Sequence, residues 1–418
     1  MIALAPEPPA RPSVLHLPFF EELAGMDEGL PGWRSVAAGV VALRLVDRWK
    51  NRIARGETVD RMELAAVEHA IDAVDVKDAV RRLLTRLIEA LRAGSAAGIL
   101  PTLMAYARTL QYEGSWTLAA DVYDSVEMHA DEEGQNVDLA IQSAMQRGYC
   151  LRMAGDLEAA ERAYHRGAEL AAMVGDRGGE LRAELGRANL LIHRGNLPQA
   201  ETLLDLVITQ AEAIPHSESL WRALHDRAQV AGRRGQLEES LLYAHRALEC
   251  CENHVDRDRI LADMATTLAA MGQRDAARDT YLILCSTASE QEVRWASAIN
   301  LLELAALDGS EPLFERYRRE LSDASLPPSL AAHFHLHVGE GSRRFGRHSA
   351  AELAFQEAIS VAQRHSVNEV LVRAESSLRA VSATSQRAAP DEYQPSAAVG
   401  EVIRAISDLR ASAGISGG

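Results

Sequence analysis

The sequence predicts an all-α protein built as a solenoid, that is, a stack of antiparallel helix pairs. The main observation is a ladder of glycines at intervals of 37 to 41 residues. Its seven members are Gly114, Gly155, Gly195, Gly235, Gly272, Gly309 and Gly346. A repeat of this length corresponds to one helix pair. Each pair of a solenoid buries its apolar face against its neighbours, so a protein of 418 residues can form one continuous array.

Residues at fixed distances from these glycines repeat as well. An Ala or Ser lies five positions after six of the seven glycines, and an Ala or Gly lies seven positions before six of them. An aromatic residue lies nine positions after four of them: Tyr123, Tyr164, Tyr281 and Phe355. Closely packed helices need small residues where their backbones approach, and a large ring fills the remaining gap. Each glycine is expected to end the first helix of its pair in a left-handed conformation.

Three segments that follow ladder glycines resemble the turn and second helix of tetratricopeptide repeats: GDLEAAERAY (155–164), GNLPQAETLL (195–204) and GQLEESLLYA (235–244). The resemblance covers roughly residues 97–365. The usual repeat has 34 residues, so these repeats are lengthened, like those of bacterial tetratricopeptide regulators. The resemblance implies a right-handed superhelical solenoid.

The repeat at Gly309 departs from the pattern. Leu302 and Phe314 replace its two small residues. We therefore expect its helices to pack differently from those of the other repeats.

The sequence divides into four parts by composition and periodicity. Residues 1–14 are rich in proline and are expected to form a disordered tail. Residues 15–96 are helical without a clear repeat, and residues 97–381 form the solenoid of about seven helix pairs. Residues 382–418 contain a linker, a short helix at 400–414 and a flexible tail.

Two interpretations of the N-terminal helices are open: they form a cap on the solenoid or a dimerisation element. Terminal repeats need a polar cap or a partner, and the helix at 400–414 is expected to cap the other end. Trp33 and Trp49 predict exposed apolar surface on the N-terminal helices. A homodimer therefore remains an alternative to a monomer.

Charge and hydropathy exclude several classes of partner. The formal net charge is −16 and the pI is about 5.4, so neither nucleic acid nor an anionic membrane surface is an expected partner. No apolar stretch approaches the roughly 18 residues of a membrane span. The N-terminus lacks the basic segment and apolar run of a signal peptide. The four cysteines show neither zinc-site nor disulfide spacing, and we expect a cytoplasmic protein with reduced thiols.

The sequence shows no catalytic motif. It lacks a phosphate-binding GxxxxGK[ST] loop, a GxSxG nucleophile elbow and an HExxH zinc motif, so an enzyme is not predicted, nor is any cofactor. His333 and His337 lie four residues apart, a helical spacing that suits a transition metal, and Glu340 follows one turn later. No distant ligand cluster accompanies them, so a polar helix face is favoured over a metal site.

The resemblance to tetratricopeptide repeats also implies which residues line the concave face, because the first helix of each pair does so in that family. Counting back from the turn glycines predicts a peptide-binding groove of twelve residues: Arg108, Tyr112, Gln142, Tyr149, Arg152, Arg182, Asn189, His193, Arg222, His225, Gln229 and Arg233. Guanidinium groups bind side-chain carboxylates or the terminal carboxylate of a peptide, and amides pair with peptide backbone. The competing interpretation is that these arginines pair with acids of adjacent helices, since nearly all basic residues of this protein are arginine.

These features predict an interaction scaffold or adaptor that holds a protein or an extended peptide, acidic or bound by its C-terminus, in an arginine-lined groove. The alternative is a regulatory protein in which a ligand or peptide controls a transcription factor or kinase. The N-terminal helices would then transmit the signal, although they contain no clear basic recognition helix.

Overall fold

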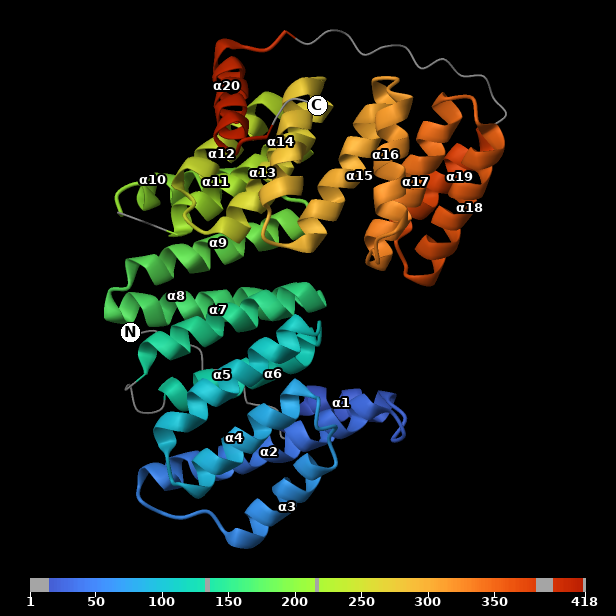
Figure 1. Cartoon of the computed structure of the whole chain (residues 1–418). Coiled ribbons are helices and arrows are strands. Elements are labelled where there is room, and N and C mark those ends of the chain that lie inside the picture. The colour runs from blue at the N-terminus through green and yellow to red at the C-terminus, as the bar shows by residue number, and fades with distance from the viewer. Residues whose placement is uncertain (1–14, 132–135, 215–217, 381–393, 416–418) are drawn as a thin grey trace. The chain divides into compact units, whose positions relative to one another are not determined.

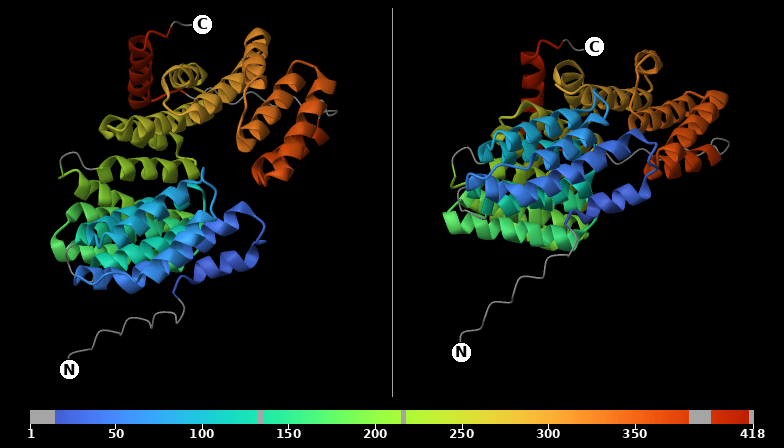
Figure 2. Two further views of the ribbon diagram at one scale, coloured as in Figure 1. Left: turned by 60° about the horizontal axis from the view of Figure 1, so that its bottom comes forward. Right: turned by 90° about the horizontal axis from the view of Figure 1, so that it is seen from below.

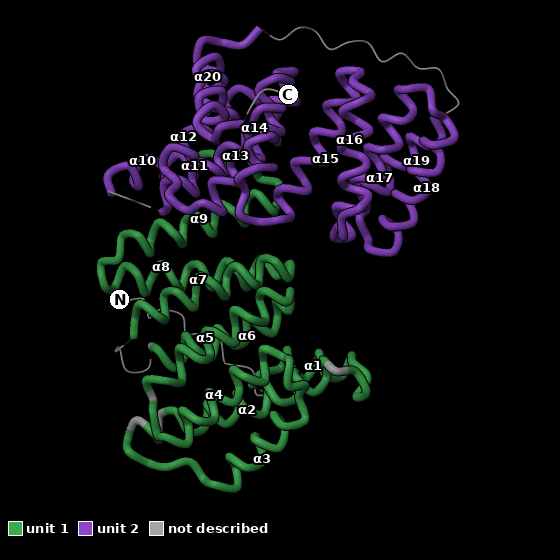
Figure 3. Tube along the Cα trace, viewed as in Figure 1, with its two compact units in different colours: residues 1–203 green, residues 204–418 purple. Residues whose placement is uncertain are grey.

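The computed structural model describes residues 15–131, 136–214, 218–380 and 394–415, and within these ranges it contains twenty helices and no strand (Figure 1). The all-α class predicted from the sequence is confirmed. The protein forms two compact units, Met1–Leu203 and Leu204–Gly418, which are described separately (Figure 3). The predicted N-terminal tail and most of the predicted linker lie outside the described residues.

Unit 1 is a stack of helices in which consecutive helices pack on one another (Figure 2). Its helices are α1 (Leu17–Gly25), α2 (Pro31–Ala54), α3 (Arg61–Asp72), α4 (Ala79–Arg92), α5 (Ala96–Tyr112), α6 (Trp116–Asp131), α7 (Val137–Ala154), α8 (Leu157–Val174) and α9 (Arg177–His193). The next helix, α10 (Leu197–Ala211), crosses the boundary between the units.

Unit 2 is also built from helix pairs. Its helices are α11 (Glu218–Arg233), α12 (Leu237–Cys250), α13 (His254–Ala270), α14 (Arg274–Thr287), α15 (Gln291–Leu307), α16 (Glu311–Ser322), α17 (Pro328–Arg344), α18 (His348–Arg364), α19 (Asn368–Arg379) and α20 (Ala397–Ser412). From α5 to α18 the odd-numbered helices are the first members of the pairs and the even-numbered helices are the second.

The glycine ladder marks the turns between paired helices. All seven glycines have a positive φ, between 71° and 87°. At Gly155 the backbone N–H bonds to the Arg152 carbonyl oxygen, which closes the last turn of α7. A side chain at such a position would meet its own backbone, which explains why glycine recurs there.

The small and large residues of the pattern meet across the helix pairs. The ring of Tyr164, on α8, lies against Gly148 of α7 and Gly186 of α9. A Cβ atom at Gly148 would approach the ring to 2.8 Å, and one at Gly186 would come closer still. The prediction that an aromatic ring fills the space left by small residues is confirmed here.

The packing changes at the irregular repeat, as its sequence predicts. Phe314 of α16 is fully buried, with its ring against Gly341 and 5.3 Å from the ring of Phe345, both at the end of α17. Helix α15 packs directly on α17, whereas α16 touches α17 only lightly. A large ring at the small-residue position therefore separates α16 from the regular stack.

One expectation for the N-terminal helices is wrong. Trp49 is only 7% exposed, and its indole N–H donates to Glu63 of α3. Helix α2 is covered by α1, α3, α4, α5 and α6, so its apolar residues face protein on several sides. Trp49 therefore provides no exposed surface for a homodimer, and Trp33 is half-buried.

A buried charged network ties α1 and α2 to α6. His16, the N-cap of α1, places its Nε2 2.9 Å from Asp47 of α2 and its Nδ1 2.6 Å from Asp121 of α6. Asp47 also lies 2.8 Å from Nε2 of His129, and Lys50 donates to the His129 carbonyl oxygen. Only an imidazolium can donate from both ring nitrogens, so this geometry calls for a charged His16.

The charge of His16 predicts a loss of stability at alkaline pH. Burial alone would lower the pKa of His16, but its hydrogen bonds to Asp121 and Asp47 and their charges outweigh burial and raise the pKa from 6.5 to about 9. A pKa raised by folding stabilises the fold fully below the unfolded value and loses this effect as the pH rises through the folded value. Between about pH 7 and pH 10 the free energy of unfolding should therefore fall by about 3 kcal/mol. Urea unfolding at both pH values should show that His16→Asn lacks most of this decline; an equal decline in the variant would contradict the assignment.

The C-terminal helix does not cap the end of the array, contrary to expectation. Val399, Val402 and Ile406 form a buried face on α20, which packs against α12 and α14 in the middle of unit 2. Arg410 pairs with Asp279 of α14, and Ser396 bonds to Glu238 of α12. An apolar stripe on α20 requires an apolar partner, and the second helices of two neighbouring pairs supply it.

Candidate functional site

The predicted groove residues of unit 1 lie on α5, α7 and α9, the first helices of three successive pairs. Helix α9 packs on α7, and a buried hydrogen bond of 3.3 Å from Ser143 to the Met104 sulfur joins α7 to α5. Arg108, Tyr112 and Gln142 are exposed, and the Tyr112 side chain is 93% exposed. These three helices therefore present polar and aromatic side chains that the rest of unit 1 does not cover.

Three of the predicted residues meet in one cluster. Nη1 of Arg152 donates to Nε2 of His193 at 2.7 Å, linking α7 to α9. The same guanidinium lies over the ring of Tyr149, 5.2 Å from its centroid. The Tyr149 ring packs edge-on against Trp116 at 5.9 Å. The cluster holds the Arg152 guanidinium plane in a fixed orientation.

Two of the predicted arginines pair with acids close by in sequence. Arg182 lies 3.1 Å from Asp176, the N-cap residue of its own helix α9, and Arg222 lies 2.6 Å from Glu218 on α11. Both arginine side chains are about half exposed, at 45% and 50%. The Asn189 side-chain amide donates to the Leu185 carbonyl oxygen at 3.1 Å. These positions are thus partly satisfied within the protein.

In unit 2, polar contacts connect several odd-numbered helices to the next odd-numbered helix. His225 of α11 lies 2.8 Å from Asp263 of α13, His337 of α17 lies 3.7 Å from Glu303 of α15, and Arg373 of α19 lies 3.5 Å from Glu340 of α17. Burial alone would lower the pKa of His225, but the hydrogen bond and charge of Asp263 raise it above its ordinary value. The remaining predicted residues, Gln229 and Arg233, are exposed on α11.

Sequence reasoning missed the acidic members of this face. Asp263 lies nine positions before Gly272, a position outside the spacings that predict the groove. Glu303 lies six positions before Gly309, and that irregular repeat contributes no residue to the predicted groove. Extending the count to position nine and to every glycine of the ladder would have found both residues.

A small open hollow of about 270 Å³ lies between α13, α14 and α15. Its lining includes Thr266, Tyr281, Asn300, Glu303, Leu304 and Leu307. The hydroxyls of Thr266 and Tyr281 lie 3.2 Å apart. The volume falls just below the range of about 300–1,000 Å³ typical of small-molecule pockets, so the hollow suits a single side chain better than a cofactor.

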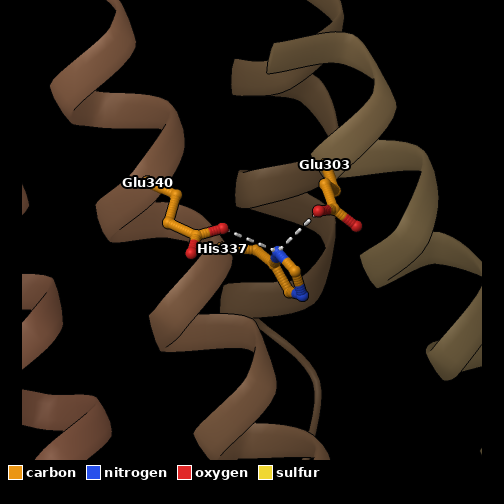
Figure 4. A group of neighbouring side chains, drawn as sticks. All are labelled: Glu303, His337 and Glu340. Carbon is orange, nitrogen blue, oxygen red and sulfur yellow. Dashed lines mark ion pairs between the residues drawn. The ribbon is translucent and has the colours of Figure 1, made fainter. Parts of the chain in front are cut away.

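The two histidines that the sequence singles out do not act together. Nδ1 of His333 lies 2.9 Å from the Ser329 carbonyl oxygen of its own helix. His337 instead lies beside Glu303 and Glu340, from α15 and α17 (Figure 4).

None of the described helices is long and apolar enough to cross a membrane.

The fold defines the class of protein: this is an all-helical repeat protein. The polar residues described above lie on the odd-numbered helices of its helix pairs. No protein-family model matches the sequence, and the search of curated proteins found no match. Three solved structures show likeness to the fold at low sequence identity.

The first is a Rap protein complexed with Competence and Sporulation Factor, at 12% identity and a TM-score of 0.41, covering 83% of this protein and 99% of that one. The second is BtubC (BKLC) from P. vanneervenii, at 13% identity and a TM-score of 0.26, covering 88% and 100%. The third is a circular tandem repeat protein with a novel repeat topology, at 15% identity and a TM-score of 0.15, covering 91% and 100%. At these scores the likenesses identify neither a family nor a ligand.

Proposed function

We propose that this protein is an interaction scaffold whose unit 1 binds an extended, acidic segment of a partner protein along its odd-numbered helices α5, α7 and α9. The observation that carries the proposal is an uncovered row of side chains on these helices. Tyr112 is 93% exposed at the end of α5, next to the exposed Arg108. Large exposed aromatic residues and arginines are the residue types that anchor protein partners.

Charge supports an acidic partner. Within the described residues no carboxylate lies within ion-pair distance of Arg108 or Arg152, although the protein has a formal net charge of −16. Many other arginines of both units pair with Asp or Glu, as Arg182 and Arg222 do. An arginine without an acidic partner on an acid-rich protein can bind a carboxylate without breaking an internal ion pair.

The position of α20 supports the choice of face. This helix covers α12 and α14, which are second helices of their pairs, and leaves the first helices of unit 2 without a covering element among the described residues. We further propose that the repeats are of the tetratricopeptide kind, lengthened to 37–41 residues. Such a scaffold would act in the cytoplasm, within a bacterial regulatory system, and without catalysis.

A peptide selection tests the scaffold. Peptides from a random phage-displayed library should be enriched for Asp and Glu, and the selected peptides should bind the purified protein in fluorescence anisotropy. Arg108→Glu combined with Arg152→Glu should weaken binding at least about tenfold, because each charge-assisted hydrogen bond contributes about 1.5–3 kcal/mol. Tyr112→Ala should also weaken it.

The matched control reverses two exposed arginines on even-numbered helices of unit 1, Arg86→Glu on α4 with Arg162→Glu on α8. This control changes the net charge equally and should leave the affinity unchanged. Equal loss in both double variants would show that only long-range charge matters. No enriched peptide, or full binding by the Arg108/Arg152 variant, would refute the groove.

A further inference from the structure

Three potential metal ligands converge between α15 and α17 of unit 2 (Figure 4). Nδ1 of His337 lies 3.4 Å from a carboxylate oxygen of Glu340 and 3.7 Å from one of Glu303. All three donor atoms lie within 4.8 Å of one another. Figure 4 shows Nδ1 pointing between the two carboxylates.

The imidazole nitrogen at the centre of this group is buried and incompletely satisfied. His337 is 5% exposed, and its Nδ1 forms no hydrogen bond, although the two carboxylates lie 3.4 and 3.7 Å away. Buried polar atoms are nearly always paired, so an exception calls for an explanation such as an ion. The imidazole nitrogen and the two carboxylate oxygens surround one point and lie farther apart than the roughly 2.9 Å of an ordinary hydrogen bond. This arrangement leaves room for an ion between them.

The charges of the group favour a cation. Glu303 and Glu340 both present carboxylate oxygens to the buried imidazole nitrogen of His337. With a neutral imidazole, two carboxylates carry two negative charges, and Arg373 faces only Glu340, at 3.5 Å. A divalent ion would neutralise the remainder.

We propose that Glu303, His337 and Glu340 form a binding site for a divalent transition metal ion of the Zn²⁺ type. An imidazole nitrogen selects such ions over Mg²⁺ and Ca²⁺, which prefer oxygen ligands alone. Three protein ligands leave a fourth position for water, and Glu303 also lines the open hollow beside α13, which gives the site access to solvent. The proposal does not depend on peptide binding by the odd-numbered helices.

Isothermal titration calorimetry of the chelator-treated, full-length protein with ZnCl₂ tests the site. We expect one Zn²⁺ bound per protein molecule through this group, and much weaker binding of MgCl₂. Glu303→Gln and His337→Asn should each lower the Zn²⁺ affinity at least about tenfold. Bound Co²⁺ should give visible absorption bands that are lost in His337→Asn.

The matched control is His333→Asn, one turn earlier on α17, whose ring bonds to its own helix. It should bind Zn²⁺ like the unchanged protein. Far-UV circular dichroism checks that the variants fold, and the nearly isosteric Glu303→Gln keeps the test valid if His337→Asn unfolds. No Zn²⁺ binding, equal binding by Glu303→Gln, or loss of binding in His333→Asn would each overturn the proposal.

Discussion

Asp47→Ala should lower the free energy of unfolding of unit 1 by about 3–5 kcal/mol, the cost of breaking a buried ion pair by removing one of its members. The Asp47 side chain is 8% exposed and accepts hydrogen bonds from His16, His129 and Ser125 at 2.9, 2.8 and 3.2 Å. These hydrogen bonds and charges outweigh burial and hold the pKa of Asp47 far below its ordinary value. Its removal leaves His16 with a single acceptor, Asp121.

Urea unfolding followed by circular dichroism would measure this loss, with Asp27→Ala as the matched control. Asp27 is exposed and lies in the connection between α1 and α2, so its removal should change the stability by less than about 0.5 kcal/mol. A protein with two compact units can unfold in more than one urea-induced transition. Hydrogen exchange should therefore localise the loss of protection to α1, α2 and α6. Similar stability of the two variants would contradict the network.

Tyr164→Ala should also destabilise unit 1 by about 3–5 kcal/mol, the range measured when large aromatic residues are truncated in protein cores. Tyr164 is 4% exposed, and its ring fills the space over Gly148 and Gly186. Neither glycine has a side chain that could move into the cavity left by the ring. The contacts of α8 with both α7 and α9 should weaken together.

Tyr112→Ala is the matched control, because it removes the same atoms from a side chain that is 93% exposed. It should leave the unfolding midpoint unchanged while weakening peptide binding, the reverse of the effect expected for Tyr164→Ala. Thermal and urea unfolding of both variants would measure the difference. If Tyr112→Ala were as destabilising as Tyr164→Ala, the assignment of Tyr164 to the core and of Tyr112 to the surface would be wrong.

The exposure of candidate site residues was predictable where it depends only on their position along one helix. Gln142 and Arg108 are exposed on first helices, as counting from the turn glycines predicts. The count could not show which arginines remain available, since Arg182 and Arg222 pair with nearby acids whose side-chain conformations the sequence does not specify. Nor could it show that Arg152 and His193, 41 residues apart, are in contact.

The sequence by itself determined the helical class, the turns of the ladder and the small-residue contacts such as Gly148 with Tyr164. These features depend on local conformation and on neighbouring helices, so they repeat at a fixed spacing that is visible in the sequence. Only the tertiary structure decided the pairing of His16 with Asp121, 105 residues apart, and the docking of α20, where Arg410 meets Asp279 across 131 residues. The same holds for the convergence of Glu303 with His337. Such contacts occur once, between residues with no periodic relation, and they follow from the shapes and charges of surfaces that exist only after the helices have packed.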